Sequence, residues 1–164
     1  AEQNTIIGNT VLYGATSGKL YASGQAGERF AVRNSGSFAI IEGCGAHGCE
    51  YMTGGTAIIL GAVGDNFGAG MTGGMAFIYD EKNEFENFAN PASIIWQPVE
   101  TNYWKKFLEE SIKDFIQKTS SKKAKKILEN FKVELKKFKQ VCPIEMLDKL
   151  DNPITLRSQN KKAG

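Results

Sequence analysis

The sequence has few of the residues that metal centres and disulfide frameworks require. It has one histidine and three cysteines among 164 residues, so one chain cannot form a multi-histidine metal site, and the odd cysteine count does not favour a disulfide framework. No apolar run approaches the ~20 residues of a transmembrane helix, and no basic segment followed by an apolar one begins the chain. We therefore expect reduced thiols, no membrane contact and a cytoplasmic location.

Glycine and lysine are each nearly absent from one half of the chain. Seventeen of the 18 glycines precede residue 75, and 16 of the 17 lysines follow residue 80. Residues 1–80 carry three basic and six acidic side chains, and residues 81–164 carry 17 basic and 12 acidic ones. This split predicts a β domain over residues 1–86, a connector with a helical extension over 87–150, and a flexible tail over 151–164.

The glycine-rich half repeats with a period of 19 residues. Segments 33–41, 52–60 and 71–79 each begin with a turn of small residues and continue with four or five apolar residues. One short β-branched or aromatic run per period is typical of a solenoid of parallel strands. The expected fold is therefore mainly β, a parallel β-helix with a small α-helical extension. Sharp corners favour glycine, and these positions are Gly54, Gly55, Gly73 and Gly74.

Both faces of the expected strands are apolar, so one face fills the solenoid and the other needs a cover. The cover is either the lysine-rich half or another domain. That half shows one helical stripe from Trp104 to Ile116, with Asn102 as its cap. A second helix, capped by Ser120 or Ser121, is expected to extend to Phe138, and Pro143 is expected to open a third.

The lysines at 122, 123, 125 and 126 favour a solvated helix face, because no arginine or aromatic cluster accompanies them. We therefore expect no nucleic-acid partner. Residues 43–48 match G-x-G-x-x-G, but the glycines that follow prevent the helix that a dinucleotide site needs. Gly36, Gly68 and Gly70 are better explained as coil corners.

Cys44, His47 and Cys49 have a spacing that invites a metal or a thiol-nucleophile interpretation. A structural zinc needs four ligands, and the remaining Cys142 lies in the helical half. We favour two small buried thiols and a histidine at a corner.

The glycine-rich half contains two sets of charged residues that are candidates for a functional site. One is a set of carboxylates that no pattern places together on one face: Glu28, Glu42, Glu50 and Asp65. The other is Arg29 and Arg33, which alternation puts on one face together with residue 31. These arginines form a candidate docking patch for a partner's carboxylate, and ion pairs with Glu28 or Glu50 remain an equal alternative.

Four colinear stretches resemble one family. They are residues 8–16 (GNTVLYGAT), 27–36 (GERFAVRNSG), 47–55 (HGCEYMTGG) and 67–74 (FGAGMTGG). They are similar to the C-terminal glycine-repeat (GXGXG) domain of the glutamate synthase large subunit, and residues 119–128 and 138–143 resemble its helical extension. The resemblance covers about residues 5–150 and implies a right-handed β-helix.

The resemblance implies a non-catalytic structural role. The parent enzyme makes two glutamates from glutamine, 2-oxoglutarate and a reductant, in ammonia assimilation, using FMN and an iron–sulfur cluster. None of the residues that perform this chemistry matches this chain, so we expect no catalytic, cofactor or metal residues and no activity from it alone. The implied partners are the amidotransferase domain, the FMN-binding synthase domain and the small subunit. The alternative is a free-standing accessory subunit of the formylmethanofuran dehydrogenase type.

The family's β-helix also begins before the position of Asn4. We therefore expect an exposed strand near residues 10–13 at the end of the stack, and self-association of the chain through it.

Overall fold

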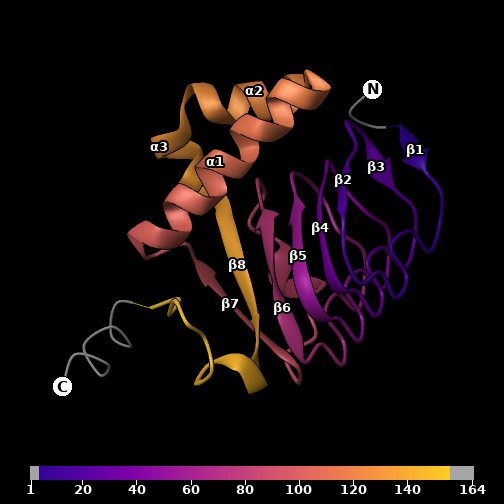
Figure 1. The fold of residues 1–164 in the computed structure, drawn as a ribbon. Coiled ribbons are helices and arrows are strands. Elements are labelled where there is room, and N and C mark those ends of the chain that lie inside the picture. The colour runs from indigo at the N-terminus through magenta and orange to yellow at the C-terminus, as the bar shows by residue number, and fades with distance from the viewer. Residues whose placement is uncertain (1–3, 156–164) are drawn as a thin grey trace.

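The structure is a computed structural model that describes residues 4–155, and its centre is a stack of parallel strands beside three helices (Figure 1). The strands are β1 (Thr5–Ile7), β2 (Lys19–Tyr21), β3 (Gln25–Ala26), β4 (Ser35–Ile41), β5 (Thr53–Ile59), β6 (Gly73–Tyr79), β7 (Ile94–Pro98) and β8 (Phe138–Pro143). The helices are α1 (Asn102–Thr119), α2 (Lys122–Glu129) and α3 (Phe131–Glu134), with short 3-10 turns at Phe85–Asn87, Leu135–Lys137 and Ile144–Met146. The predicted solenoid with a helical extension is confirmed.

A period of 18 or 19 residues sets the register of the stack. Paired positions are 19 residues apart between β2 and β4 and mostly 19 apart between β5 and β6, but a register shift makes most of them 18 apart between β4 and β5. Strands β2, β4, β5 and β6 pair in parallel in that order, and Ala39 lies beside Ala57, which lies beside Ala76. The next inward positions, Ile41, Ile59 and Ile78, form a second column in the same buried cluster. Like residues therefore stack on like residues, and the solenoid interior fills with repeated alanine and isoleucine.

Glycines at the start of β5 and β6 lie where the coils approach each other closely. A Cβ at Gly73 would lie 2.0 Å from the carbonyl oxygen of Thr53, and one at Gly54 would lie 2.3 Å from that of Ser35. Gly55 and Gly74 instead have φ values of +83° and +79°. Both constraints exclude larger residues, one by contact and the other by backbone conformation.

The wall opposite the strands has an unusual backbone. Every second residue in segments 10–14, 29–33, 47–51 and 66–70 has a left-handed φ between 54° and 74°. Hydrogen bonds still connect the coils here, such as Thr10 N–H to Glu28 O (2.9 Å) and Arg29 N–H to Ala46 O (2.9 Å). We call these four segments the left-handed wall. The strand expected near residues 10–13 is therefore wrong, because Thr10 and Leu12 have left-handed rather than extended backbones.

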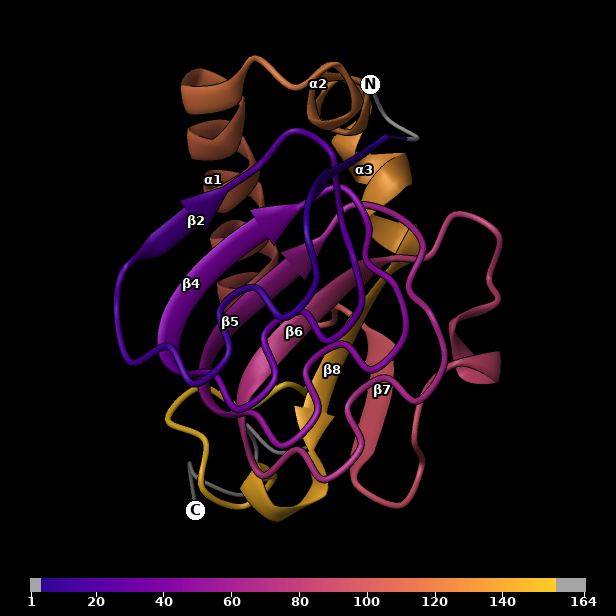
Figure 2. The same cartoon turned by 90° about the vertical axis from the view of Figure 1, so that its right-hand side faces the viewer.

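The second apolar face of the sheet is covered by the lysine-rich half, which was one of the two predicted covers. Ile40, Ile58 and Phe77 pack in one cluster with residues of α1 and α2. The helical members are Leu108, Ile112, Phe115, Ala124 and Ile127. Helix α1 crosses this face of the strands (Figures 1 and 2). The cap of α1 is Thr101, whose Oγ1 accepts a bond from Trp104 N–H at 3.4 Å, and not the predicted Asn102.

The expected second helix ends early. It stops at Glu129, and Phe138 begins strand β8 instead of ending a helix. β8 runs antiparallel to β6 and to β7, so the parallel stack is extended by one antiparallel strand and then by β7, which runs in the same direction as β6. Helical spacing at Leu135 and Phe138 suggested a helix, but Phe138 is fully buried beside Tyr79 as a sheet residue, with the ring centroids 5.2 Å apart.

The start of the expected tail is packed against the fold. Ile154 is buried, and its carbonyl accepts a bond from Gln97 Nε2 at 2.7 Å. The carbonyl of Asn152 accepts one from Trp104 Nε1 at 3.0 Å. Residues 151–155 are therefore held beside α1 and β7, and the flexibility expected for 156–164 lies outside the described residues. The sheet also continues beyond residue 86 through β7 and β8, while the domain division at that position stays a prediction.

Candidate docking surface

Arg29 and Arg33 lie on the outside of the left-handed wall. Both are exposed, with φ values of 60° and 56°, while the three residues between them are buried. Ala31 is therefore not on their face, because the segment is not an extended strand. Among the described residues neither guanidinium forms an ion pair, so the alternative pairs with Glu28 and Glu50 do not form.

Two tyrosines flank the arginines. Tyr13 is 52% exposed and Tyr51 is 54% exposed. The Arg33 guanidinium lies over the Tyr13 ring, 5.9 Å from its centroid. The Tyr51 ring lies against Gly70, where a Cβ would approach it to 2.5 Å. We call Tyr13, Arg29, Arg33 and Tyr51 the arginine–tyrosine face. Its tyrosines were not predicted from the sequence, although Tyr51 takes the place of Arg33 in the next segment of the left-handed wall.

Cys44, His47 and Cys49 point to different sides of the same coil. The His47 Nδ1 lies 2.6 Å from Glu50 Oε1 on the outer side, and its side chain is 39% exposed. Both cysteines belong to the buried interior cluster. Burial raises the pKa of the Cys44 thiol to about 12 and raises the pKa of Cys49 well above its usual value. Burial thus favours the protonated form of both thiols, which pack in the solenoid interior. In residues 4–155 no group of three potential ligands is placed to hold a metal.

Of the four carboxylates singled out in the sequence, Glu42 is the buried one. It is 2% exposed, and its Oε1 accepts bonds from Ser121 Oγ at 2.5 Å and Ser23 Oγ at 3.0 Å. The same Ser121 oxygen accepts a bond from Ala124 N–H, which caps α2. The negative charge also lies near the positive end of the α2 dipole. Glu42 therefore fastens α2 to the solenoid, a role that no spacing in the sequence indicated.

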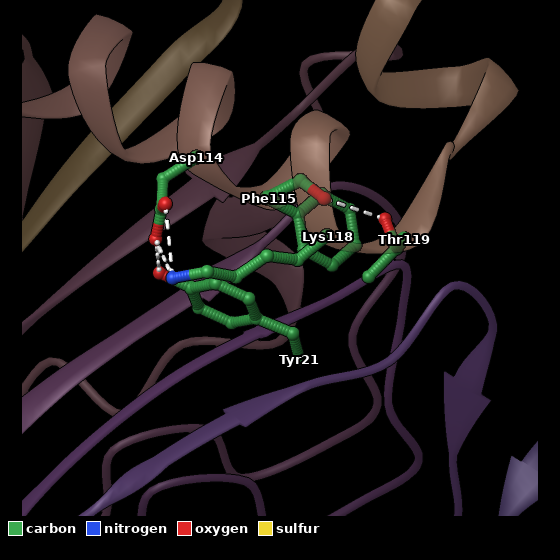
Figure 3. A network of polar contacts seen from close by, with 5 residues as sticks. All are labelled: Tyr21, Asp114, Phe115, Lys118 and Thr119. Atoms are coloured by element: carbon green, nitrogen blue, oxygen red, sulfur yellow. Dashed lines mark hydrogen bonds and ion pairs between the residues drawn. The ribbon is translucent and has the colours of Figure 1, made fainter.

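A tyrosine–carboxylate–lysine network holds the end of α1 (Figure 3). Tyr21 OH donates to Asp114 at 2.6 Å, and Lys118 Nζ lies 3.0 Å from the same carboxylate. These bonds lower the pKa of Asp114, the hydroxyl bond most and then the lysine bond. Burial and the bond to Asp114 raise the pKa of Tyr21 well above its usual value.

A second network of the same kind holds the segment after α3. Tyr79 OH donates to Glu134, and Lys137 Nζ lies 2.9 Å from Glu134. The hydroxyl and then the lysine lower the pKa of the Glu134 carboxyl. The two networks join strands β2 and β6 to the helical half, so the extension and the solenoid form one packed unit.

The GXGXG motif family model matches residues 1–144, and the chain belongs to that family. It is 56% identical over 154 residues to the glutamate synthase [NADPH] large chain of Azospirillum brasilense, covering 94% of this chain and 10% of the relative. It is 51% identical over 142 residues to ferredoxin-dependent glutamate synthase 2 of Synechocystis, covering 87% and 9%. It is 45% identical over 161 residues to glutamate synthase [NADH] of Schizosaccharomyces pombe, covering 98% and 8%.

The chain thus corresponds to the GXGXG domain of glutamate synthase large chains, and it spans about a tenth of the length of these relatives. The resemblance stated from the sequence is confirmed. Within residues 4–155 no helix is both long enough and apolar enough to cross a membrane.

Proposed function

We propose that this chain is the non-catalytic, structural and docking part of a cytoplasmic glutamate synthase. The parent enzyme would convert glutamine, 2-oxoglutarate and a reductant into two glutamates, in glutamate biosynthesis. The observation that carries the proposal is the 56% identity over 94% of the chain to a glutamate synthase large chain. FMN and the iron–sulfur cluster belong to the other parts of the parent enzyme. The partners are its amidotransferase and synthase domains, and on the same reasoning its small subunit.

The arginine–tyrosine face is the docking surface in this proposal. A non-glycine residue in the left-handed region costs roughly 1–2 kcal/mol, and Arg29 and Arg33 are exposed, so core packing does not require them. Glycine would adopt the same backbone without this cost, as it does at Gly14 and Gly70. Tyrosine and arginine are also the residues most often found at the energetic centres of interfaces. The strained arginines therefore fit a partner that presents carboxylates.

The first test concerns activity. The purified 164-residue chain is mixed with glutamine, 2-oxoglutarate and a reductant, and glutamate is followed over time. We expect no glutamate, and no flavin absorbance after gel filtration. Glutamate formation by this chain alone would contradict a non-catalytic role.

The second test separates docking from stability. Arg29→Gly with Arg33→Gly relieves backbone strain, so the isolated chain should unfold at higher urea concentration. In the complete enzyme the same pair should accelerate proteolytic release of this domain severalfold. Thr10→Gly with Asn66→Gly is the matched control, since both residues are exposed and left-handed. The control should stabilise the chain without faster release; equal release rates for both pairs would contradict docking through the arginines.

A further inference from the structure

A cavity opens where the end of β6 meets α2. Its volume is about 400 Å³, and small-molecule sites typically have volumes of roughly 300–1,000 Å³. It is lined by the coil corner at residues 61–63, by the end of β6 and the turn that follows it, and by Lys123 of α2. None of these residues belongs to the arginine–tyrosine face. We call this space the β6-end cavity.

The buried side chains that line the β6-end cavity are mostly apolar. Val63, Ile78 and Phe85 are buried, and Phe88 is half-buried. The ring of Trp96 packs against Phe85 from behind this lining, with the ring centroids 5.7 Å apart and the planes at 85°. The cavity can therefore cover an apolar group, and Trp96 is placed to report on its arrival.

Five charged side chains complete the lining, and they are Asp80, Glu81, Lys82, Glu84 and Lys123. Within residues 4–155 none of the five forms an ion pair. The carboxylate of Asp80 instead holds the turn, because its oxygens accept bonds from the amides of Glu84 at 2.8 Å and Phe85 at 3.1 Å. Glu81 and Glu84 are exposed, so their carboxylates are available to a ligand.

Lys123 differs from the other lysines of α2. Its neighbours Lys122, Lys125 and Lys126 are exposed, as expected for a solvated helix face. Lys123 is half-buried, and its Nζ lies 2.9 Å from the position that a Cβ on Gly61 would occupy. A partly buried charge is favourable only when it is paired. This ammonium group therefore gains more from an incoming carboxylate than a fully solvated lysine would.

We propose that the β6-end cavity binds an α-amino acid with an apolar side chain, in its zwitterionic form. The carboxylate of the ligand pairs with Lys123, and its ammonium group pairs with Glu81 and Glu84. The apolar side chain of the ligand packs on Val63 and Phe88. A simple carboxylic acid would face the acidic groups of the turn without compensation, and a simple amine would face the lysines. The inference goes beyond the docking role and does not rest on it.

The test is a titration of the ¹⁵N-labelled 164-residue chain with L-phenylalanine, followed by NMR. We expect a dissociation constant of about 1–10 mM, with shifts confined to residues 61–63 and 78–88, Lys123 and the indole of Trp96. Two matched probes each lack one charge: 3-phenylpropanoate has no ammonium group, and phenethylamine has no carboxylate. Each should bind about fivefold more weakly than phenylalanine, because it loses one ion pair.

Variants of the chain assign the two charges of the ligand. Lys123→Met should weaken phenylalanine binding about fivefold and should not weaken phenethylamine binding. Glu81→Gln with Glu84→Gln should weaken phenylalanine binding and should not weaken 3-phenylpropanoate binding. The matched controls are Lys122→Met and Glu86→Gln, which change exposed charges outside the cavity. Both controls should leave phenylalanine binding unchanged.

Three results would overturn the proposal. The first is the absence of shifts at ten times the expected dissociation constant. The second is equal affinity for the three probes, because the charges of the lining would then play no part in binding. The third is an equal effect of Lys123→Met and Lys122→Met, which would show that only the general charge of α2 matters.

Discussion

Replacing Glu42 tests the attachment of the helices to the solenoid. Glu42→Ala removes a buried carboxylate that accepts two hydroxyl bonds, one from Ser23 and one from Ser121, the cap of α2. Hydrogen bonds to charged groups each contribute about 1.5–3 kcal/mol. Removing the carboxylate also relieves its desolvation cost, which offsets part of this loss.

We expect Glu42→Ala to lower the free energy of unfolding by about 3 kcal/mol, a large fraction of the ~5–15 kcal/mol typical of a domain. Glu42→Gln keeps one acceptor oxygen, so its expected loss is about half as large. Glu28→Ala removes an exposed carboxylate from the neighbouring coil, and surface changes of this kind usually stay within about 0.5 kcal/mol.

Urea unfolding, followed by circular dichroism, measures the free energy of unfolding of the three variants. A double-mutant cycle with Ser121→Ala isolates the central bond, and its coupling energy should be about 1 kcal/mol or more. A loss for Glu42→Ala as small as that for Glu28→Ala would refute the reasoning. So would additive effects of Glu42→Ala and Ser121→Ala, because the two side chains would then act independently.

Thr10→Gly should raise the free energy of unfolding by about 1 kcal/mol, because a β-branched residue is strained at φ 65°; an unchanged urea midpoint would contradict this. Gly73→Ala places a Cβ against the backbone carbonyl of the preceding coil and should cost more than about 2 kcal/mol, whereas Gly8→Ala meets nothing within 4 Å and should be nearly neutral. Asp114 and Glu134 have lowered pKa values in the folded state. Their contribution to stability is therefore present above the unfolded pKa values near ~4 and is lost as pH falls below them. Urea midpoints between pH 2 and 7 should show this loss, and Asp114→Asn with Glu134→Gln should flatten it.

The stacked strands follow from a visible period, so the sequence predicts them well. Ala57 and Ala76 occupy equivalent places in equivalent segments, and parallel pairing brings such positions together. The two apolar faces of each strand also predict a cover on the outer side. In both cases the same pattern of residues recurs in each coil, and this recurrence allows the structure to be predicted from the sequence.

The left-handed wall lacks such a signal. Arg29, Ala31 and Arg33 adopt positive φ values although none of them is glycine. Their residue types favour other conformations, and the hydrogen bonds between stacked coils override that preference. Strand β8 could not be predicted from the sequence for the same reason, because long-range contacts set its conformation. Phe138 fits a helical stripe until its pairing with Tyr79 is known. The docking role of Arg29 and Arg33 stays a prediction.

The position of β8 in the chain has a consequence for the order of folding. Each repeat of a solenoid contacts only its neighbours, so each strand pairs with the strands of the adjacent coils. The last strand of the parallel stack, β6, pairs with β5 on one edge, and the partner on its other edge comes only from residues 138–143, after β7 and the three helices have been synthesised. During translation the stack therefore remains open for some sixty residues beyond its last coil. Completion of the domain is set by its final strand, and a ribosome that stalls before residue 138 would expose an unpaired, apolar edge to chaperones.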